Sequence, residues 1–266
     1  MEIDSLSPLS KLQTTWDTPI QYRLNTQNKT IPLNTYLSKD IQIRYEGKII
    51  CIRCGRETKK SFFQGYCYPC FKRSPETAEC IIHPERCRAH LGEGKDPSWE
   101  KKHHNQEHIV YLARSSAIKV GVTRADQLPT RWIDQGATEG LIFAQTPNRY
   151  TAGVLEVALK QHITDKTAWQ AMLKNTHCDA SLADKKDALT QHIPSKMHHF
   201  ITTDNKGITM SYPVISYPEK IKALNLDKTP FYEGRLLGIK GQYLLLEGGI
   251  VFNVRRHSGY LCRVCV

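Results

Sequence analysis

Long apolar runs are missing from this chain of 266 residues. No stretch approaches the roughly 18 to 20 consecutive apolar residues that a membrane-spanning helix needs. The start, Met1 to Lys11, lacks the charged-then-apolar pattern of a signal peptide. We therefore expect a cytoplasmic protein with no membrane partner. Internal repeats are also absent, which excludes a repeat architecture.

Acidic residues are fewer than basic ones. The chain has 26 Asp and Glu against 37 Lys and Arg, a formal net charge of +11. This imbalance predicts attraction to polyanions, nucleic acid among them. The hydrophobic share of 40% and the charged share of 24% are typical of a globular protein.

Apolar periodicity is nearly absent from residues 51–108, which hold six of the nine cysteines and five of the eleven histidines. Such a segment needs another source of stability, and a bound metal provides one. Two pairs, Cys51-x2-Cys54 and Cys67-x2-Cys70, supply four thiolates, the tetrahedral set that zinc prefers. No thioredoxin-like βαβ pattern surrounds them, so we expect structural zinc rather than redox chemistry.

Two further groups of cysteines are weaker candidates. Cys80, Cys87 and His104 predict a second zinc site, with a fourth ligand from His90, His103 or His108; alternatively, both cysteines are reduced beside solvent-facing histidines. Cys262-x2-Cys265 is either a solvent-facing thiol pair on the last strand or part of a ligand set.

The order of patterns predicts an α+β protein of four segments. We expect an N-terminal β segment over 1–50, with a hairpin turn at Glu46-Gly47, and a zinc-binding module over 51–108. A small antiparallel sheet with flanking helices follows over 109–200, and a C-terminal β module over 201–266.

Within 109–200 the spacing of apolar residues places individual elements. Strands are predicted at 109–113, 118–122 and 141–144. Helices are predicted to begin at Pro129, to cover 155–163 and 169–173 with a break at Asp165, and to begin again after Ser181, whose pairing with Asp184 resembles a capping box.

Four positions in this segment resemble the GIY-YIG nuclease superfamily. Ile109-Val110-Tyr111 stands where GIY would be, and Lys119-Val120-Gly121 where YIG would be. Arg131 follows on the next helix and Glu156 on the helix after the third strand. The stretch Cys51 to Trp169 also resembles an uncharacterised prokaryotic family, whose members often carry cysteines where Gly94 and His104 stand here.

The resemblance implies roles for these residues. Tyr111 would activate water or accept a proton, Arg131 would neutralise the phosphate, and Glu156 would hold Mg²⁺ or Mn²⁺. Lys119 replaces the second tyrosine and would stabilise developing negative charge, and Arg124 is an alternative phosphate ligand. Each residue also has an ordinary interpretation, as a strand aromatic, a solvated helix residue or a surface charge.

Basic and aromatic side chains alternate in the zinc segment, a mixture suited to phosphate contacts and base stacking. The predicted contacts are Lys59, Lys60, Lys72 and Arg73, while Phe62 and Phe71 are expected to form a miniature core. The leading interpretation is a zinc-containing protein that binds DNA or RNA, with phosphodiester cleavage as its activity. The alternatives are a non-catalytic RNA- or ribonucleoprotein-binding module and a scaffold whose zinc segment binds another protein.

Overall fold

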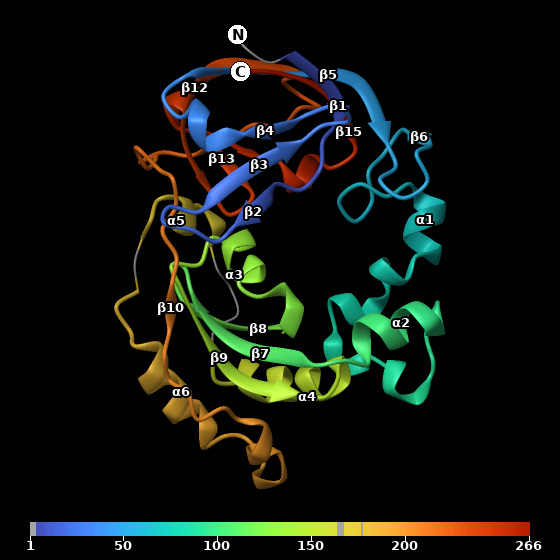
Figure 1. Cartoon of the computed structure of the whole chain (residues 1–266), viewed down its shortest axis with the longest axis vertical. Helices are drawn as coiled ribbons and strands as arrows, with labels where there is room; N and C mark the ends of the chain where they lie inside the picture. The colour runs from blue at the N-terminus through green and yellow to red at the C-terminus, as the bar shows by residue number, and fades with distance from the viewer. Residues whose placement is uncertain (1–3, 164–167, 177) are drawn as a thin grey trace. The chain divides into compact units, whose positions relative to one another are not determined.

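The computed structural model describes residues 4–163, 168–176 and 178–266. The chain forms two compact units, of which unit 1 combines Met1–Lys72 with Ser211–Val266 and unit 2 is Arg73–Met210 (Figure 1). Both units combine antiparallel strands with short helices or 3₁₀ turns, so the predicted α+β class is confirmed. The two predicted metal clusters fall in different units, because the division lies after Lys72.

Unit 1 is built on an eight-stranded sheet with the order β1-β15-β5-β12-β13-β14-β11, in which β6 pairs only with β5. Its strands are β1 (Asp4–Pro8), β5 (Asp40–Ile50), β6 (Glu57–Thr58), β11 (Lys222–Ala223), β12 (Phe231–Lys240), β13 (Tyr243–Leu246), β14 (Ile250–Asn253) and β15 (Tyr260–Cys265). A second, antiparallel sheet contains β2 (Gln13–Thr15), β3 (Gln21–Asn25) and β4 (Thr30–Pro32). The early strands β1 and β5 therefore pair with strands from the last part of the chain.

The turn predicted at Glu46-Gly47 is wrong. Strand β5 continues through both residues, and its register with β15 shifts between Tyr260 and Cys262. The extra residues form a bulge in which Gly47 has a φ of +75°. The strand bends at this point instead of reversing.

Unit 2 contains a four-stranded antiparallel sheet with the order β10-β9-β7-β8. Its strands are β7 (His108–Arg114), β8 (Ile118–Arg124), β9 (Glu139–Thr146) and β10 (Ile208–Thr209), and its later helices are α3 (Thr130–Asp134), α4 (Arg149–Lys160), α5 (Trp169–Leu173) and α6 (Leu182–Thr190). The first three strands and the helices α3, α5 and α6 confirm the predicted elements, whereas α4 begins at Arg149 and ends at Lys160 instead of covering 155–163. The predicted break at Asp165 lies outside the described residues.

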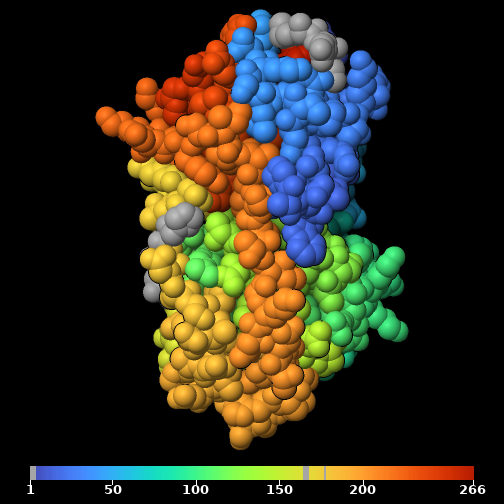
Figure 2. Space-filling view, turned by 60° about the vertical axis from the view of Figure 1, so that its left-hand side comes forward, coloured from blue at the N-terminus to red at the C-terminus, as the bar shows by residue number. Residues whose placement is uncertain are grey.

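The two faces of this sheet are covered by different helices. Apolar side chains of β7, β8 and β9 pack against α4 and α6 through residues such as Leu112, Phe143, Leu155 and Leu189. Helix α3 lies on the opposite face (Figure 1). Helix α6 begins as predicted, since Ser181 Oγ accepts a hydrogen bond from the Asp184 N–H at 3.2 Å. Together with the 3₁₀ turn η7 (Ser195–Phe200), α6 forms an outer surface of unit 2, golden to orange in Figure 2.

The chain between the two sheets consists of short elements. They are α1 (Tyr68–Arg73), the 3₁₀ turns η2 (Pro75–Thr77), η3 (Glu79–Ile81), η4 (Pro84–Arg86) and η5 (Ala89–Leu91), and α2 (Pro97–His104). The remaining 3₁₀ turns are η1 (Leu33–Tyr36), η6 (Ala125–Gln127), η8 (Glu247–Gly249) and η9 (Arg255–His257). In the part of the chain that the structure describes, no helix combines the length and the hydropathy needed to cross a membrane.

Candidate functional site

Four cysteine side chains of unit 1 gather between β5 and α1. The sulfur atoms of Cys51, Cys54, Cys67 and Cys70 all lie within 4.8 Å of one another, and those of Cys54 and Cys67 are 3.8 Å apart. Around a zinc ion with Zn–S bonds of about 2.3 Å, a tetrahedron places the sulfurs about 3.8 Å apart. The donor set fits a closed structural zinc site, which leaves no ligand position for a substrate.

Glycines shape the backbone around these sulfurs. Gly55 has a φ of +70° and its N–H donates to the Cys51 carbonyl at 2.9 Å, which closes the first turn. Gly65 has a φ of +121°, and its carbonyl accepts from the Ile52 N–H at 2.9 Å. Burial raises the pKa of Cys51, but N–H groups of Cys67, Cys54 and Arg53 that hydrogen-bond its sulfur outweigh burial and lower the pKa to about 6. The local backbone thus favours the thiolate that zinc requires.

Aromatic rings supply the small apolar core of this module. Phe62 stacks on Phe71 with centroids 5.9 Å apart and meets Tyr68 edge-on at 5.3 Å. The Lys60 ammonium lies 5.4 Å from the centroid of the Phe62 ring. Phe62 and Phe71 thus pack against each other as predicted, although both rings remain half-buried.

A second cluster lies in unit 2. The sulfurs of Cys80 and Cys87 are each 3.7 Å from Nδ1 of His104, and the three ligand atoms lie within 4.8 Å of one another. All three side chains are buried. The structure therefore brings together the three residues predicted for a second zinc site.

The histidines predicted as fourth ligands do not join this cluster. His90 is exposed and stacks on Tyr150 at 4.6 Å. His103 contacts Arg124 through Nδ1, and Nδ1 of His108 donates to the Gln106 carbonyl at 2.7 Å. None of the three histidines belongs to the group of ligand atoms that lie within 4.8 Å of one another.

Sequence reasoning missed Glu100, which is only 3% exposed. It lies one turn before His104 on α2, a helix whose N-cap Asp96 accepts a hydrogen bond from the Trp99 N–H at 3.0 Å. The signal was available in the sequence: the Asp96-Pro97 helix start and the four-residue spacing of Glu100 and His104 place both on one face of a helix.

Cys262 and Cys265 do not face solvent, so that interpretation is wrong. Both side chains are buried in β15, and Cys262 is only 1% exposed. Burial raises the pKa of Cys262 to about 12, with the charge of Glu46 acting in the same direction. The thiols are core residues of the eight-stranded sheet.

Tyr111 lies across the face of the unit 2 sheet that α3 covers. It pairs with Gly121 on β8, and a Cβ built on Gly121 would come 2.5 Å from the Tyr111 hydroxyl. Gln135 donates to this hydroxyl at 2.6 Å, and Trp132 meets the ring edge-on at 6.0 Å. The phenol is held in one position, and Tyr111 is only 1% exposed.

Arg131 links Tyr111 electrostatically to Glu156. Burial lowers the pKa of the Arg131 guanidinium, but Tyr111, Asp134 and Glu156 outweigh burial, so that the pKa is raised. Glu156 is buried on α4, where its carboxylate is 3.5 Å from the Lys160 ammonium. The charges of Tyr111 and Glu156 thus both act on Arg131, which is half-buried and the most exposed of the three residues.

Two further predicted phosphate contacts lie on β8. Strand alternation and the pairing of Lys119 with Ala113 place Lys119 on the same sheet face as Tyr111. Arg124 is engaged elsewhere, since it pairs with Asp126 at 3.1 Å and contacts His103. This arrangement favours Lys119 over Arg124 as a partner of Tyr111.

A basic pocket of about 490 Å³ lies in unit 1 beside the four-cysteine module. Lys59, Lys60 and Arg256 line it, and all three are exposed. Asp227 also lines the pocket, and its carboxylate accepts hydrogen bonds from the Tyr260 hydroxyl at 3.1 and 3.2 Å. Lys72 and Arg73, at the end of α1, are also exposed but do not line this pocket.

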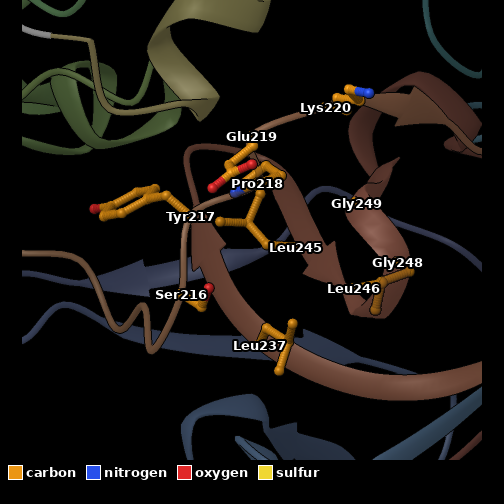
Figure 3. Close-up of a pocket in the computed structure, with 10 residues that line it drawn as sticks. All are labelled: Ser216, Tyr217, Pro218, Glu219, Lys220, Leu237, Leu245, Leu246, Gly248 and Gly249. Atoms are coloured by element: carbon orange, nitrogen blue, oxygen red, sulfur yellow. The ribbon is translucent and has the colours of Figure 1, made fainter.

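A second pocket of unit 1, about 450 Å³, is formed by residues 216–220 over β12, β13 and η8 (Figure 3). Its apolar lining comes from Leu237, Leu245 and Leu246. None of its ten lining residues is a predicted site residue.

Comparison with known proteins identifies the family. A family model described as "Protein of unknown function (DUF2797)" matches residues 38–262. The chain belongs to this family. The DUF2797 match spans both metal clusters as well as Tyr111, Arg131 and Glu156, which confirms the predicted membership of an uncharacterised family. No curated protein and no solved structure matches the chain.

Proposed function

We propose that this DUF2797 protein binds nucleic acid through the basic pocket beside its four-cysteine module. The observation that carries the proposal is the position of Lys59, Lys60 and Arg256 around one pocket. Three cations around a pocket of this size suit a phosphate backbone, because each neutralised phosphate releases condensed counterions. The net charge of +11 adds a long-range attraction.

The first test reverses the charges of the pocket. Lys59→Glu, Lys60→Glu and Arg256→Glu, combined, should weaken binding to single-stranded and duplex oligonucleotides at least tenfold and reduce the salt slope by about three. The matched control, Lys29→Glu with Lys222→Glu and Arg235→Glu, makes the same change in net charge at exposed positions of unit 1 outside the pocket. Filter binding across a salt series measures both.

The control decides between a local and a general effect. Equal losses in the two triple variants would show that total charge, not the pocket, governs binding. No binding of wild type to DNA or RNA at low salt would reject the proposal in favour of the protein-binding scaffold.

A second candidate function is phosphodiester cleavage of the GIY-YIG type. The observations that favour it are the position of Lys119 on the same sheet face as Tyr111 and the effect of both Tyr111 and Glu156 on the pKa of Arg131. In this proposal Glu156 holds Mg²⁺ or Mn²⁺, Arg131 neutralises the phosphate, and Tyr111 assists proton transfer with Lys119 nearby. These are the residues that the nuclease resemblance implies.

The cleavage proposal is tested with labelled DNA and RNA in the presence and absence of Mg²⁺ or Mn²⁺. Divalent-dependent cleavage should disappear in Glu156→Ala and Tyr111→Phe, while Glu107→Ala, at an exposed position of unit 2, should retain it. Arg131→Ala should lower both turnover and affinity, because the guanidinium contacts the phosphate before and during the reaction. Cleavage unchanged in Glu156→Ala would reject the assignment.

The non-catalytic alternative predicts a different pattern. Binding would then be lost in Arg131→Ala and unaffected by Glu156→Ala, and no divalent ion would produce cleavage by the wild type.

A further inference from the structure

The segment of unit 2 between η2 and α2 has almost no apolar core. Its cluster of buried apolar residues contains only Ala78, Cys80, Cys87 and Ala89. Side chains this small bury little apolar area, and the backbone here consists of single 3₁₀ turns. The segment therefore needs a stabilising element besides hydrophobic burial.

The spacing of the cysteines and His104 suggests what that element is. Both sulfur-to-nitrogen distances are 3.7 Å. A tetrahedral zinc ion with Zn–S of about 2.3 Å and Zn–N of about 2.0 Å separates such ligand atoms by about 3.5 Å. Because all three side chains are buried, the cluster is shielded from water on most sides. Three ligands of a tetrahedral site are thus in place.

Glu100 is the acidic side chain buried on the same helix face as His104. Its Oε1 accepts a hydrogen bond from the Lys95 N–H at 3.1 Å. Its Oε2 occupies the position that a Cβ would take on Gly94, so the glycine makes room for the carboxylate. A carboxylate that is 3% exposed is costly unless a cation or several hydrogen bonds compensate for its lost hydration.

Helix geometry places this carboxylate beside the cluster, because Glu100 lies one turn before His104 and both side chains are buried on the same face of α2. The Glu100 oxygens are not among the atoms that lie within 4.8 Å of one another, so a turn of the side chain must bring one of them to a metal. Such a turn about its own rotatable bonds leaves the helix unchanged.

We propose that Cys80, Cys87, His104 and Glu100 form a second zinc site, in which the Glu100 carboxylate is the fourth ligand. Two thiolates, one imidazole and one carboxylate are all ordinary zinc ligands. The carboxylate also supplies a negative charge at the fourth coordination position, which the two cysteines and the histidine leave open.

The site also fixes helix α4. Arg149, in its first turn, donates from Nε to the Cys80 carbonyl at 2.8 Å and from Nη2 to the Ile81 carbonyl at 2.9 Å. Gly153 lies directly against the backbone of Pro84 and Glu85, with no room for a Cβ. Metal binding therefore orders the backbone on which the first half of α4 rests.

Metal content of the full chain tests the proposal. Zinc measured by elemental analysis should be two per chain in wild type and one in Cys80→Ser and His104→Ala. After exchange with Co²⁺, the four-cysteine site of unit 1 provides an internal reference, because its absorption should persist in both variants. Persistence of that signal shows that the loss of metal is confined to unit 2.

Glu100 is tested separately. Glu100→Gln should lower the resistance of one Co²⁺ to a competing chelator at least tenfold and shift its absorption, whereas Glu93→Gln, at an exposed nearby position, should do neither. Combining Gly94→Cys with Glu100→Ala should restore tight binding and add thiolate-to-metal absorption, since the new thiol would occupy the space of the carboxylate.

Two results would overturn the proposal. One zinc per chain in wild type, unchanged in Cys80→Ser, would show that unit 2 binds no metal. Identical chelator resistance and absorption in Glu100→Gln and Glu93→Gln would show that Glu100 is not a ligand.

Discussion

Several glycines of unit 2 each face a group that fills the space of a missing side chain. Gly121 faces the Tyr111 hydroxyl, Gly140 the Trp132 ring, and Gly94 the Glu100 carboxylate. In each case the absence of a Cβ decides where a functional or aromatic side chain can lie. The positions of these glycines are therefore as informative about the sites as the polar residues themselves.

Substitution of one of these glycines should reveal the contact. Gly121→Ala should lower the free energy of unfolding by about 1–3 kcal/mol, because its Cβ would overlap the Tyr111 hydroxyl. The same change in a Tyr111→Leu background should cost less, since the overlapping ring is gone. Urea denaturation of the four proteins of this double-mutant cycle measures the difference, and additive costs would contradict the predicted contact.

For single residues, the sequence predicted which residue types bind metal better than it predicted the complete set of ligands at each site. Paired cysteines identify Cys51, Cys54, Cys67 and Cys70, because a two-residue spacing itself creates the turn that a metal needs. The four-residue spacing of Glu100 and His104 places both on one helix face, but glutamate is common on exposed helix faces, so the spacing alone does not identify Glu100 as a ligand. Its burial depends on Gly94, six residues earlier, and on packing that becomes visible only in the folded chain.

Among the elements, β5 shows why a local turn signal can mislead. Glu46-Gly47 has the composition of a hairpin turn, yet the chain continues as a bulged strand because β12 and β15 supply partners on both sides of β5. Both partner strands lie near the C-terminal end of the sequence, so no local pattern around β5 predicts the pairing. By contrast, β7 and β8 are neighbours in sequence, and their pairing was predictable from the strands alone.

The bulge in β5 requires a residue at position 47 that tolerates a positive φ. Gly47→Ala should lower the free energy of unfolding by about 1–2 kcal/mol, because a φ of +75° is unfavourable for alanine. Gly47→Asn should cost less, since asparagine tolerates this conformation and nothing lies within 4 Å of an added Cβ. Thermal or urea unfolding of the two variants compares them, and equal costs would indicate a clash instead of backbone strain.

For the molecule as a whole, the α+β class and the order of elements from β7 to α6 follow from local patterns. The division into two units does not, because it depends on pairings such as β1 with β15. Hydrophobic alternation indicates that a strand has a buried face, but this pattern does not identify the neighbouring strand in the sheet.

The two kinds of cysteine in unit 1 should respond differently to substitution. Cys51→Ser should remove one zinc per chain and lower the thermal stability of the module, because the metal replaces an apolar core. Cys262→Ser should keep full zinc content while costing about 1–3 kcal/mol, since it buries a hydroxyl in the sheet. Elemental analysis with calorimetry separates the effects; zinc loss in Cys262→Ser would contradict the assignment.

Because unit 2 interrupts unit 1 in the sequence, the nascent chain cannot complete unit 1 until its last strands are synthesised. Strand β5 is synthesised long before β12 and β15, since 187 residues separate Arg44 from its β12 partner Phe231 and 223 separate Gln42 from its β15 partner Cys265. At roughly 5–20 residues per second, ribosomes need on the order of 10–40 s to supply them. During that interval, in which unit 2 is synthesised, β5 exposes unpaired edges, a known hazard for aggregation. A message truncated after Met210 would leave the nascent product in that vulnerable state permanently.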